Sequence, residues 1–223
     1  MLIENGSHLY SYIITRDYGF APNPFHGICT LATCKPDIRS AAKIGDWILG
    51  IGGKNIKFAS HKCIFIMKVS NKISFQQYWS EPSYSIKKPM RNGSLVRAVG
   101  DNIYHRDNSG KWIQEDSHHS NPDGSTNFNN LKRDTKKTDK VLISDLFLYF
   151  GSNPVEIDIV SSLGKCPKRK HKKNYLTNSN NAGKLVVSLI EKHRSNLNTV
   201  LSDPCHFKDS HQRVDQKTGK ISL

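Results

Sequence analysis

Two neighbouring segments carry the densest group of hydrogen-bonding and titratable side chains in the sequence. The first runs from Gly100 to Asp107 (GDNIYHRD) and the second from Trp112 to Ser120 (WIQEDSHHS). Their imidazole, carboxylate, amide and phenol groups can read base edges, transfer protons or bind metal ions. These segments are the first candidates for a functional site, and the residue types alone leave the three kinds of chemistry open.

A base-reading role suits the polar residues of the first segment. Asn102 offers an amide donor and acceptor to a base edge, Asp101 can accept from an exocyclic amine, and Tyr104 can stack or donate its hydroxyl. A simple turn after Gly100 explains the short polar residues equally well. On a strand, Asn102 and Tyr104 share one face while Asp101 and His105 share the other, so only one pair can line a given pocket.

An enzymatic role is the alternative for the second segment. Asp116, His118 and His105 could act as acid/base groups or as three ligands of a catalytic metal, which would lower the pKa of bound water to about 7. Adjacent His118 and His119 point in opposite directions on a strand, so both reach one metal only where the backbone turns. A surface histidine cluster is the plainer interpretation. We therefore expect no cofactor, with a divalent metal as the alternative.

Several candidates lie outside these segments. Cys34 precedes a short helix expected to be capped by Asp37, where the helix N-terminus and Lys35 could favour a thiolate, although a small core residue is the commoner role. Trp47 is more typical of a core. Phe25 lies in a proline-rich loop, which predicts an exposed ring able to stack on a base. The remaining candidates for contact with a base are Tyr12 and His119.

The chain is strongly basic, with 33 Lys and Arg against 19 Asp and Glu and a formal net charge of +14. Such a charge attracts polyanions over a Debye length of about 8 Å, so the expected partner is nucleic acid, preferably DNA, or a nucleotide. Solubility alone would also explain the charge. Residues 165–223 contain 13 basic and 4 acidic residues and supply +9 of the total. The phosphate-binding candidates are Lys168, Arg169, Lys170, Lys172, Lys173 and Arg133.

Hydrophobic patterning predicts short strands with small helices between them. The expected strands are Leu9–Thr15, Trp47–Ile51, Cys63–Val69, Leu95–Val99, Lys111–Gln114 and Val141–Phe150. Ser74 is expected to cap a helical turn that ends before Pro82. The predicted fold class is α+β, a small and strongly bent β-sheet or partly open β-barrel with short flanking helices. A basic C-terminal helical appendage is expected to follow it.

The length of 223 residues suits one main domain with an appendage. We predict a domain over residues 1–164 and a basic tail over 165–223 with one amphipathic helix at Lys184–His193. Five widely spaced cysteines without a Cys-x-x-Cys pair indicate neither a disulfide framework nor a zinc knuckle. No apolar run is long enough for a membrane span and no signal peptide is evident, which predicts a cytoplasmic protein without a membrane partner.

Several strings of residues together resemble a known family, the second type of nucleotide modification associated domain of prokaryotes and phages. The strings are Gly19–Phe25 (GFAPNPF) after Tyr12, Thr30–Pro36 (TLATCKP), Gly45–Trp47, Gly100–His105 (GDNIYH), Asp116–His119 (DSHH) and Asn130–Asp134 (NLKRD). The resemblance covers roughly residues 8–175 and implies a context of DNA base modification. The segments Ile44–Gly50 and Ile64–Val69 also look like the core of PUA-like domains, including the EVE and ASCH groups, which implies a pocket for one flipped base.

Three functions remain open at this point. The leading hypothesis is recognition of a modified base or nucleotide, with DNA as the favoured nucleic acid, within a base-modification or defence system. The second is an enzyme that acts on such a base or nucleotide, and the third is a protein-interaction subunit of such a system. The sequence fixes neither the base nor the oligomeric state.

Overall fold

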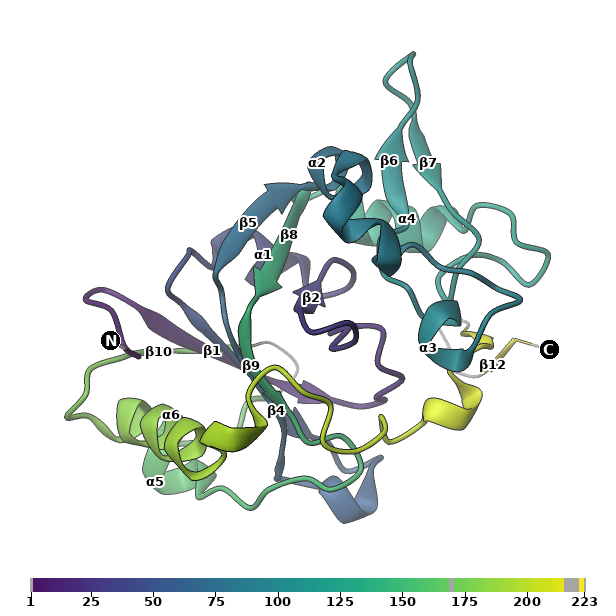
Figure 1. Cartoon of the computed structure of the whole chain (residues 1–223). Helices are drawn as coiled ribbons and strands as arrows, with labels where there is room; N and C mark the ends of the chain where they lie inside the picture. The colour runs from purple at the N-terminus through teal and green to yellow at the C-terminus, as the bar shows by residue number, and fades with distance from the viewer. Residues whose placement is uncertain (1, 169–170, 215–220, 223) are drawn as a thin grey trace.

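The computed structural model describes residues 2–168, 171–214 and 221–222. Its largest sheet has five strands in the order β10-β1-β3-β4-β9 (Figure 1). The strands are β10 (Lys172–Tyr175), β1 (His8–Ile14), β3 (Trp47–Gly52), β4 (Cys63–Lys68) and β9 (Leu146–Tyr149). β1 and β3 run parallel, and the other neighbours are antiparallel. The predicted strands at Leu9–Thr15, Trp47–Ile51 and Cys63–Val69 are therefore confirmed within a residue or two.

This sheet is buried on both faces, which explains why β3 and β4 are continuous apolar runs. Tyr10 and Tyr12 of β1 belong to a hydrophobic cluster on one face, and Leu9 and Trp47 belong to a second cluster on the other. The second cluster is covered by α5 (Ile159–Leu163) and α6 (Asn181–Lys192). Trp47 has no exposed surface, as expected for a core residue.

A three-stranded antiparallel sheet packs over the first cluster. Its order is β2-β8-β5, with β2 at Cys29–Leu31, β8 at Lys140–Ser144 and β5 at Asn71–Ser74. The single strand predicted at Val141–Phe150 is wrong, because the chain leaves β8 at Asp145 and enters the five-stranded sheet as β9. The continuous apolar pattern conceals this change of sheet.

Short helices connect and cover the sheets. They are α1 (Pro36–Ala41), α2 (Phe75–Ser80), α3 (Leu95–Ala98), α4 (Phe128–Thr135) and the 3-10 turns η1 (Lys57–Ala59) and η2 (Pro82–Lys87). The predicted cap of α2 is confirmed. The Ser74 hydroxyl accepts from the Gln77 N–H, and the Gln77 side chain accepts from the Ser74 N–H. The predicted Asp37 cap is wrong, because Lys35 occupies the cap of α1 and makes no side-chain bond there.

The segment Leu95–Val99, predicted as a strand, is also corrected, since it forms α3 with Ser94 as its cap. Its β-branched and apolar residues would suit a strand, but the cap and the following Gly100 favour a single helical turn.

The outer layer is completed by the antiparallel hairpin β6 (Tyr104–Arg106) and β7 (Trp112–Gln114), whose second strand confirms the prediction at Lys111–Gln114. In Figure 1 this hairpin projects from the end of the molecule that carries α2 and α4.

The predicted basic helical appendage is not confirmed as a separate part. β10 pairs with β1 at the edge of the five-stranded sheet. The amphipathic helix α6 exists as predicted, but Val186, Leu189 and Ile190 are buried in the second core cluster. The chain then passes through η3 (Arg194–Asn196) and η4 (Phe207–Asp209) to the short strands β11 (Arg213–Val214) and β12 (Ile221–Ser222).

The predicted α+β class is confirmed, as a set of several small sheets with short helices. None of the sheets in the described ranges closes into a barrel. The PUA-like form of the fold therefore stays unconfirmed. No helix among the residues described is both long and apolar enough to cross a lipid bilayer.

Candidate functional site

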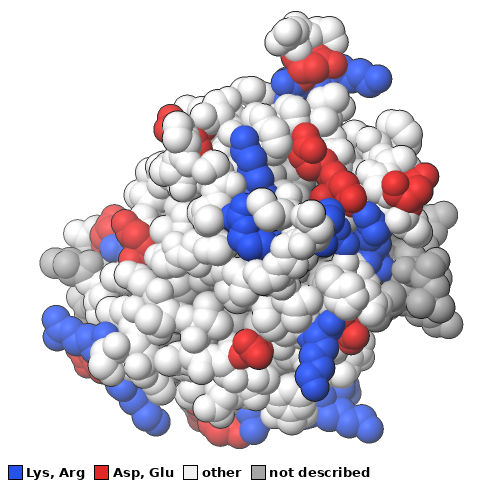
Figure 2. Space-filling model, turned by 45° about the vertical axis from the view of Figure 1, so that its right-hand side comes forward, with Lys and Arg blue, Asp and Glu red and all other residues white. Residues whose placement is uncertain are grey.

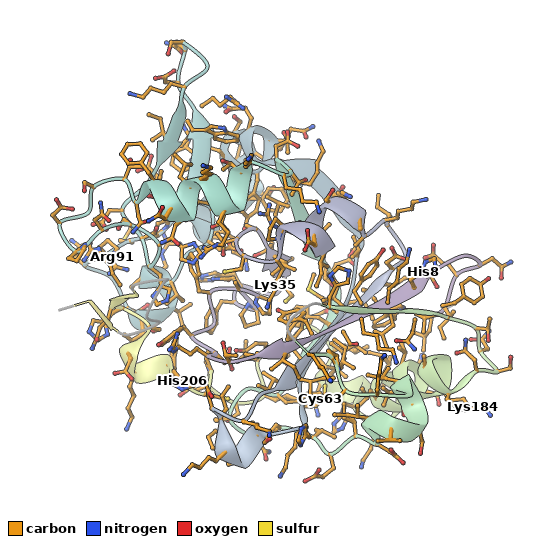
Figure 3. The ribbon with its side chains drawn as sticks, turned by 180° about the vertical axis from the view of Figure 1, so that it is seen from behind. His8, Lys35, Cys63, Arg91, Lys184 and His206 are labelled. Carbon is orange, nitrogen blue, oxygen red and sulfur yellow. The ribbon has the colours of Figure 1, made fainter. Side chains whose placement is uncertain are left out.

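A cavity of about 290 Å³ opens where β1, the loops after β1 and β2, α4 and the His118–His119 segment meet. Figure 3 shows Lys35, one of its lining residues, near the middle of the molecule, between the five-stranded sheet and the layer that contains α4. The side chains that give the cavity its chemical character are Tyr12, Arg16, Tyr18, Phe20, Cys34, Lys35, His118, His119 and Arg133. Its size is at the lower limit of the about 300–1,000 Å³ typical of small-molecule sites.

Cys34 is presented to this cavity by a strained loop between β2 and α1. Cys34 and Lys35 have φ angles of 54° and 42°, a left-handed conformation that costs roughly 1–3 kcal/mol for residues other than glycine. Asp134 Oδ1 accepts from the Cys34 N–H at 3.0 Å, and Arg39 Nε donates to the Cys34 carbonyl at 2.8 Å. Arg39 is fully buried and also donates to the carbonyls of Asp134 and Lys140. These contacts hold the loop in place.

Cys34, His119 and Asp134 form a connected chain of side chains. Cys34 Sγ lies 3.7 Å from His119 Nε2, and His119 Nδ1 lies 2.9 Å from Asp134 Oδ2. His119 and Asp134 are almost completely buried, with side-chain exposures of 2% and 0%. A thiol next to an imidazole that a carboxylate orients is the arrangement in which a nucleophilic cysteine is activated.

The electrostatics of the site favour the thiolate. Burial by itself would raise the pKa of the Cys34 thiol, but the charges of Arg133 and His119 outweigh it and lower the pKa from 9.0 to about 7. At pH 7 roughly half of the molecules would then carry a thiolate. The main causes are thus Arg133 and His119, rather than the helix terminus and Lys35 named from the sequence.

The surroundings of the two partners of Cys34, His119 and Asp134, favour their charged forms. Burial would raise the pKa of Asp134, but His119 and Arg133 hold it well below its usual range. Arg133 Nε donates to Asp134 Oδ1 at 2.9 Å, and the Tyr104 hydroxyl donates to Oδ2 at 2.9 Å. Burial and Arg133 act to lower the pKa of His119, yet Asp134 and Cys34 more than offset them and raise it. The result favours a thiolate beside an imidazolium.

His118 lies on the same wall but differs in charge. Burial and the neighbouring charge of His119 lower the pKa of His118 to about 3, so its ring is neutral at pH 7. His118 Nδ1 lies 2.6 Å from the carbonyl of Gln212, which fixes the proton on that nitrogen because a carbonyl can only accept. The C-terminal segment, residues 204–212, therefore orients one side chain of the cavity.

Aromatic rings form the wall beside the two histidines. Phe20 lies edge-on to His119 with centroids 4.6 Å apart, and Tyr18 lies 4.7 Å from His118. Gly19, which lies between Tyr18 and Phe20 in the sequence, has a φ of 71°. A Cβ at this position would lie 2.7 Å from the side chain of Pro204. Glycine is therefore required where this loop meets the C-terminal segment.

The predicted base readers of the first segment lie inside the protein. Asp101 accepts from the hydroxyls of Thr30 and Tyr78 at 2.7 and 2.8 Å, and Asn102 donates to the Tyr78 carbonyl at 2.7 Å. Both are fully buried and neither lines the cavity. Tyr104 is also fully buried, where it supports Asp134 from behind. Tyr12 and His119, by contrast, do line the cavity.

The expectation that Phe25 is exposed is wrong. Phe25 is 6% exposed, and its ring packs against Phe207 with centroids 5.5 Å apart. The proline-rich loop is irregular as predicted, but the C-terminal segment covers it. No pattern within the loop could have indicated a partner that lies so far along the chain.

The residues proposed for a metal site are held by different partners. His105 stacks on Trp79 at 4.0 Å and lies 2.7 Å from Glu115, whereas Asp116 pairs with Arg213. No group of three or more His, Cys, Asp or Glu side chains in the described parts of the chain is placed to hold a metal ion. The trio of His105, Asp116 and His118 therefore does not fit a bound metal.

The phosphate-binding candidates are spread over different places. Arg133 lines the cavity, and Lys168 lines a second cavity beside it. Lys172 donates to the Leu163 carbonyl, and Lys173 Nζ lies 5.5 Å from the ring centroid of Tyr10. Arg169 and Lys170 lie outside the described residues. Figure 2 shows basic and acidic residues interspersed on the face that it presents, without one continuous basic patch.

The role of Asp134 was missed in the sequence, and Cys34 was judged more typical of a core. A signal was nevertheless present. Cys34, His119 and Asp134 each lie in a different one of the strings on which the family resemblance rests, and the fold brings these three strings together. Their separations of 85 and 15 residues along the chain gave no local pattern.

A known family model covers most of the chain. No curated protein and no solved structure matches the chain. The family model for nucleotide modification associated domain 2 matches residues 6–211, which contain every residue of the cavity described above. The chain therefore belongs to the nucleotide modification associated domain 2 family.

Proposed function

We propose that this chain is a thiol-dependent enzyme that acts on a nucleotide, or on a base within DNA, in a nucleotide-modification system. The observation that carries the proposal is the contact chain from Cys34 through His119 to Asp134 in the wall of a cavity. A thiol pKa of about 7 keeps much of the nucleophile ionised at neutral pH. Membership of the family supplies the nucleotide context.

Each member of the group has a distinct role in this proposal. Cys34 Sγ attacks an electrophilic carbon of the base or of a group attached to it. His119 takes the thiol proton. As the S–C bond forms, a π bond at that carbon opens or its bond to a leaving group breaks, and His119 returns the proton to the atom that receives the electron pair. The S–C bond breaks again when the product is released. Asp134 holds the His119 ring in orientation and stabilises its charge. Tyr104 and Arg133 keep Asp134 ionised through the contacts already described.

The remaining lining of the cavity suits an aromatic ligand with negative charge. Tyr12, Tyr18 and Phe20 provide rings that a base can contact, and Arg16 and Lys35 provide positive charge. This composition is also what a protein that only recognises a modified base would need. Recognition without chemistry is therefore the second candidate function, with Tyr12, His118 and His119 as its contact residues.

Nucleoside profiling separates these functions. Purified wild-type protein and the variants C34A and H105A would be incubated with modified and unmodified deoxynucleotides and oligonucleotides, which are then analysed by mass spectrometry. We expect the wild type and H105A to convert at least one nucleoside and C34A to convert none. Binding of a modified nucleotide by both wild type and C34A, without conversion by either, would favour recognition. Absence of both binding and conversion would favour a protein-interaction subunit.

A further inference from the structure

A second cavity of about 180 Å³ adjoins the first and shares Tyr12, Ile13 and Lys35 with it. Its other lining residues include Asp37, Lys168 and His171. The pairing of β10 with β1 explains this neighbourhood. Ser11 is opposite Lys172, so His171, just before β10, lies near Tyr12. Lys168 and His171 thus bring part of the basic run next to the candidate active site.

Two lysines of this second cavity, Lys35 and Lys168, have no carboxylate partner among the described residues. Lys35 Nζ instead lies over the ring of Tyr12, 4.3 Å from its centroid. Burial lowers the pKa of Lys35, and the Cys34 charge offsets this only in part. A partly buried ammonium group without a carboxylate is stabilised by an anionic ligand.

An independent observation comes from Tyr12. Its side chain lines both cavities and is 2% exposed. The buried Tyr12 hydroxyl has no hydrogen-bond partner within the part of the chain that the structure describes. Buried hydroxyls are normally paired, so the unpaired Tyr12 hydroxyl beside these cavities is available to a polar group of a bound ligand. The acidic residue of the cavity, Asp37, is paired with Lys137 at 2.5 Å.

We propose that the second cavity binds a phosphate group of the substrate, with Lys35 and Lys168 as its counter-ions, while the base occupies the first cavity. This inference rests on the proposed function, because it assumes that the base lies beside Cys34. The wall shared by the two cavities, formed by Tyr12 and Lys35, then lies along the sugar. The phosphate belongs either to a free nucleotide or to the backbone of a polynucleotide.

Protection of Cys34 from iodoacetamide tests this proposal. The competitors are an equimolar mixture of the four deoxynucleosides, the same mixture of their 5′-monophosphates, and a ten-nucleotide DNA of mixed sequence. We expect the monophosphates to half-protect Cys34 of the wild type at a roughly tenfold lower concentration than the nucleosides, as expected for a charged hydrogen bond. In K168Q and K35M, the nucleosides and the monophosphates should half-protect Cys34 at similar concentrations. K184Q, a change of an α6 lysine at a different place, should retain the wild-type ratio.

The DNA arm identifies the source of the phosphate. Protection by the oligonucleotide at a much lower concentration per nucleotide, weakening with salt, would indicate a polynucleotide substrate. If the oligonucleotide and the monophosphates protect equally well per nucleotide, the substrate is a free nucleotide. The inference is overturned if nucleosides and monophosphates protect the wild type equally, if K168Q keeps the same ratio as K184Q, or if no competitor protects. The proposed function has a separate test, because it fails when C34A still converts a nucleoside.

Discussion

The substitution H119A should move the titration of Cys34 by a measurable amount. In the wild type, Arg133 and His119 together lower the thiol pKa from 9.0 to about 7. Two pH units correspond to about 2.7 kcal/mol of differential stabilisation of the thiolate. Removing the imidazolium and its contact with Sγ, while Arg133 remains, should raise the pKa by about one to two units. The thiolate population at pH 7 would fall from about one half to between about one tenth and one hundredth.

The assay is the pH dependence of iodoacetamide alkylation, followed at the Cys34 peptide by mass spectrometry. Peptide resolution separates Cys34 from Cys29 and Cys63, whose thiols burial drives to a high pKa. The midpoint of the pH–rate curve is used because intrinsic nucleophilicity also changes with thiol pKa. The variant H105A is the matched control, since His105 pairs with Glu115 instead.

Two results would overturn the assigned roles of Arg133 and His119. A wild-type midpoint near 9 would show that Arg133 and His119 do not activate the thiol, and an unchanged midpoint in H119A would show that the imidazole is not its partner. Because His119 is buried, circular dichroism and thermal unfolding must confirm that the variant is folded. The variant R133Q provides a second route to the same answer, and its midpoint should also rise.

Further consequences follow from the same contacts. R39M should lower the free energy of unfolding by about 3 kcal/mol in urea titrations, because one buried and two half-buried carbonyls lose their donor; a loss below about 1 kcal/mol would contradict this role. The pKa of Asp134 is lowered in the folded protein. Its contribution to folding stability is therefore complete above its ordinary, unfolded-state pKa of about 3.9, and it declines as the pH falls through the folded-state pKa. The stability difference between the wild type and D134N should therefore be largest near neutral pH and shrink below about pH 4, and a pH-independent difference would argue against an ionised Asp134. A chain ending at Gly164 should be unfolded when measured by circular dichroism, because it lacks Leu176 and the buried face of α6. Losing these side chains costs about 1.5–3 kcal/mol each, and the sum approaches the usual total stability of about 5–15 kcal/mol.

The central strands and α6 could be predicted because their signals are local. β3 and β4 are continuous runs of apolar residues bounded by turns, and α6 has apolar residues at helical spacing. The cap of α2 at Ser74 could be predicted for the same reason. The boundary between β8 and β9 could not, because two adjacent strands of similar composition belong to different sheets.

The candidate site was only partly predictable, because its contacts are long-range. Tyr12, His119 and Arg133 were named as candidates from their residue types, and they line the cavity. The partnership of Cys34 with Asp134 depends on how the loop before α1 meets α4, which no local spacing encodes. The predicted exposure of Phe25 failed for a related reason, since a segment near residue 207 covers it.

The most direct test of the central claim is whether Cys34 becomes covalently attached to a nucleotide during turnover. Wild-type protein and C34A would be incubated at pH 7 with the nucleoside that the profiling identifies as converted, supplied as its nucleotide or oligonucleotide, quenched in acid, digested and analysed by mass spectrometry. We expect a base-derived mass on the Cys34 peptide of the wild type, no adduct in C34A, and no turnover by C34A. Undiminished turnover by C34A would contradict it.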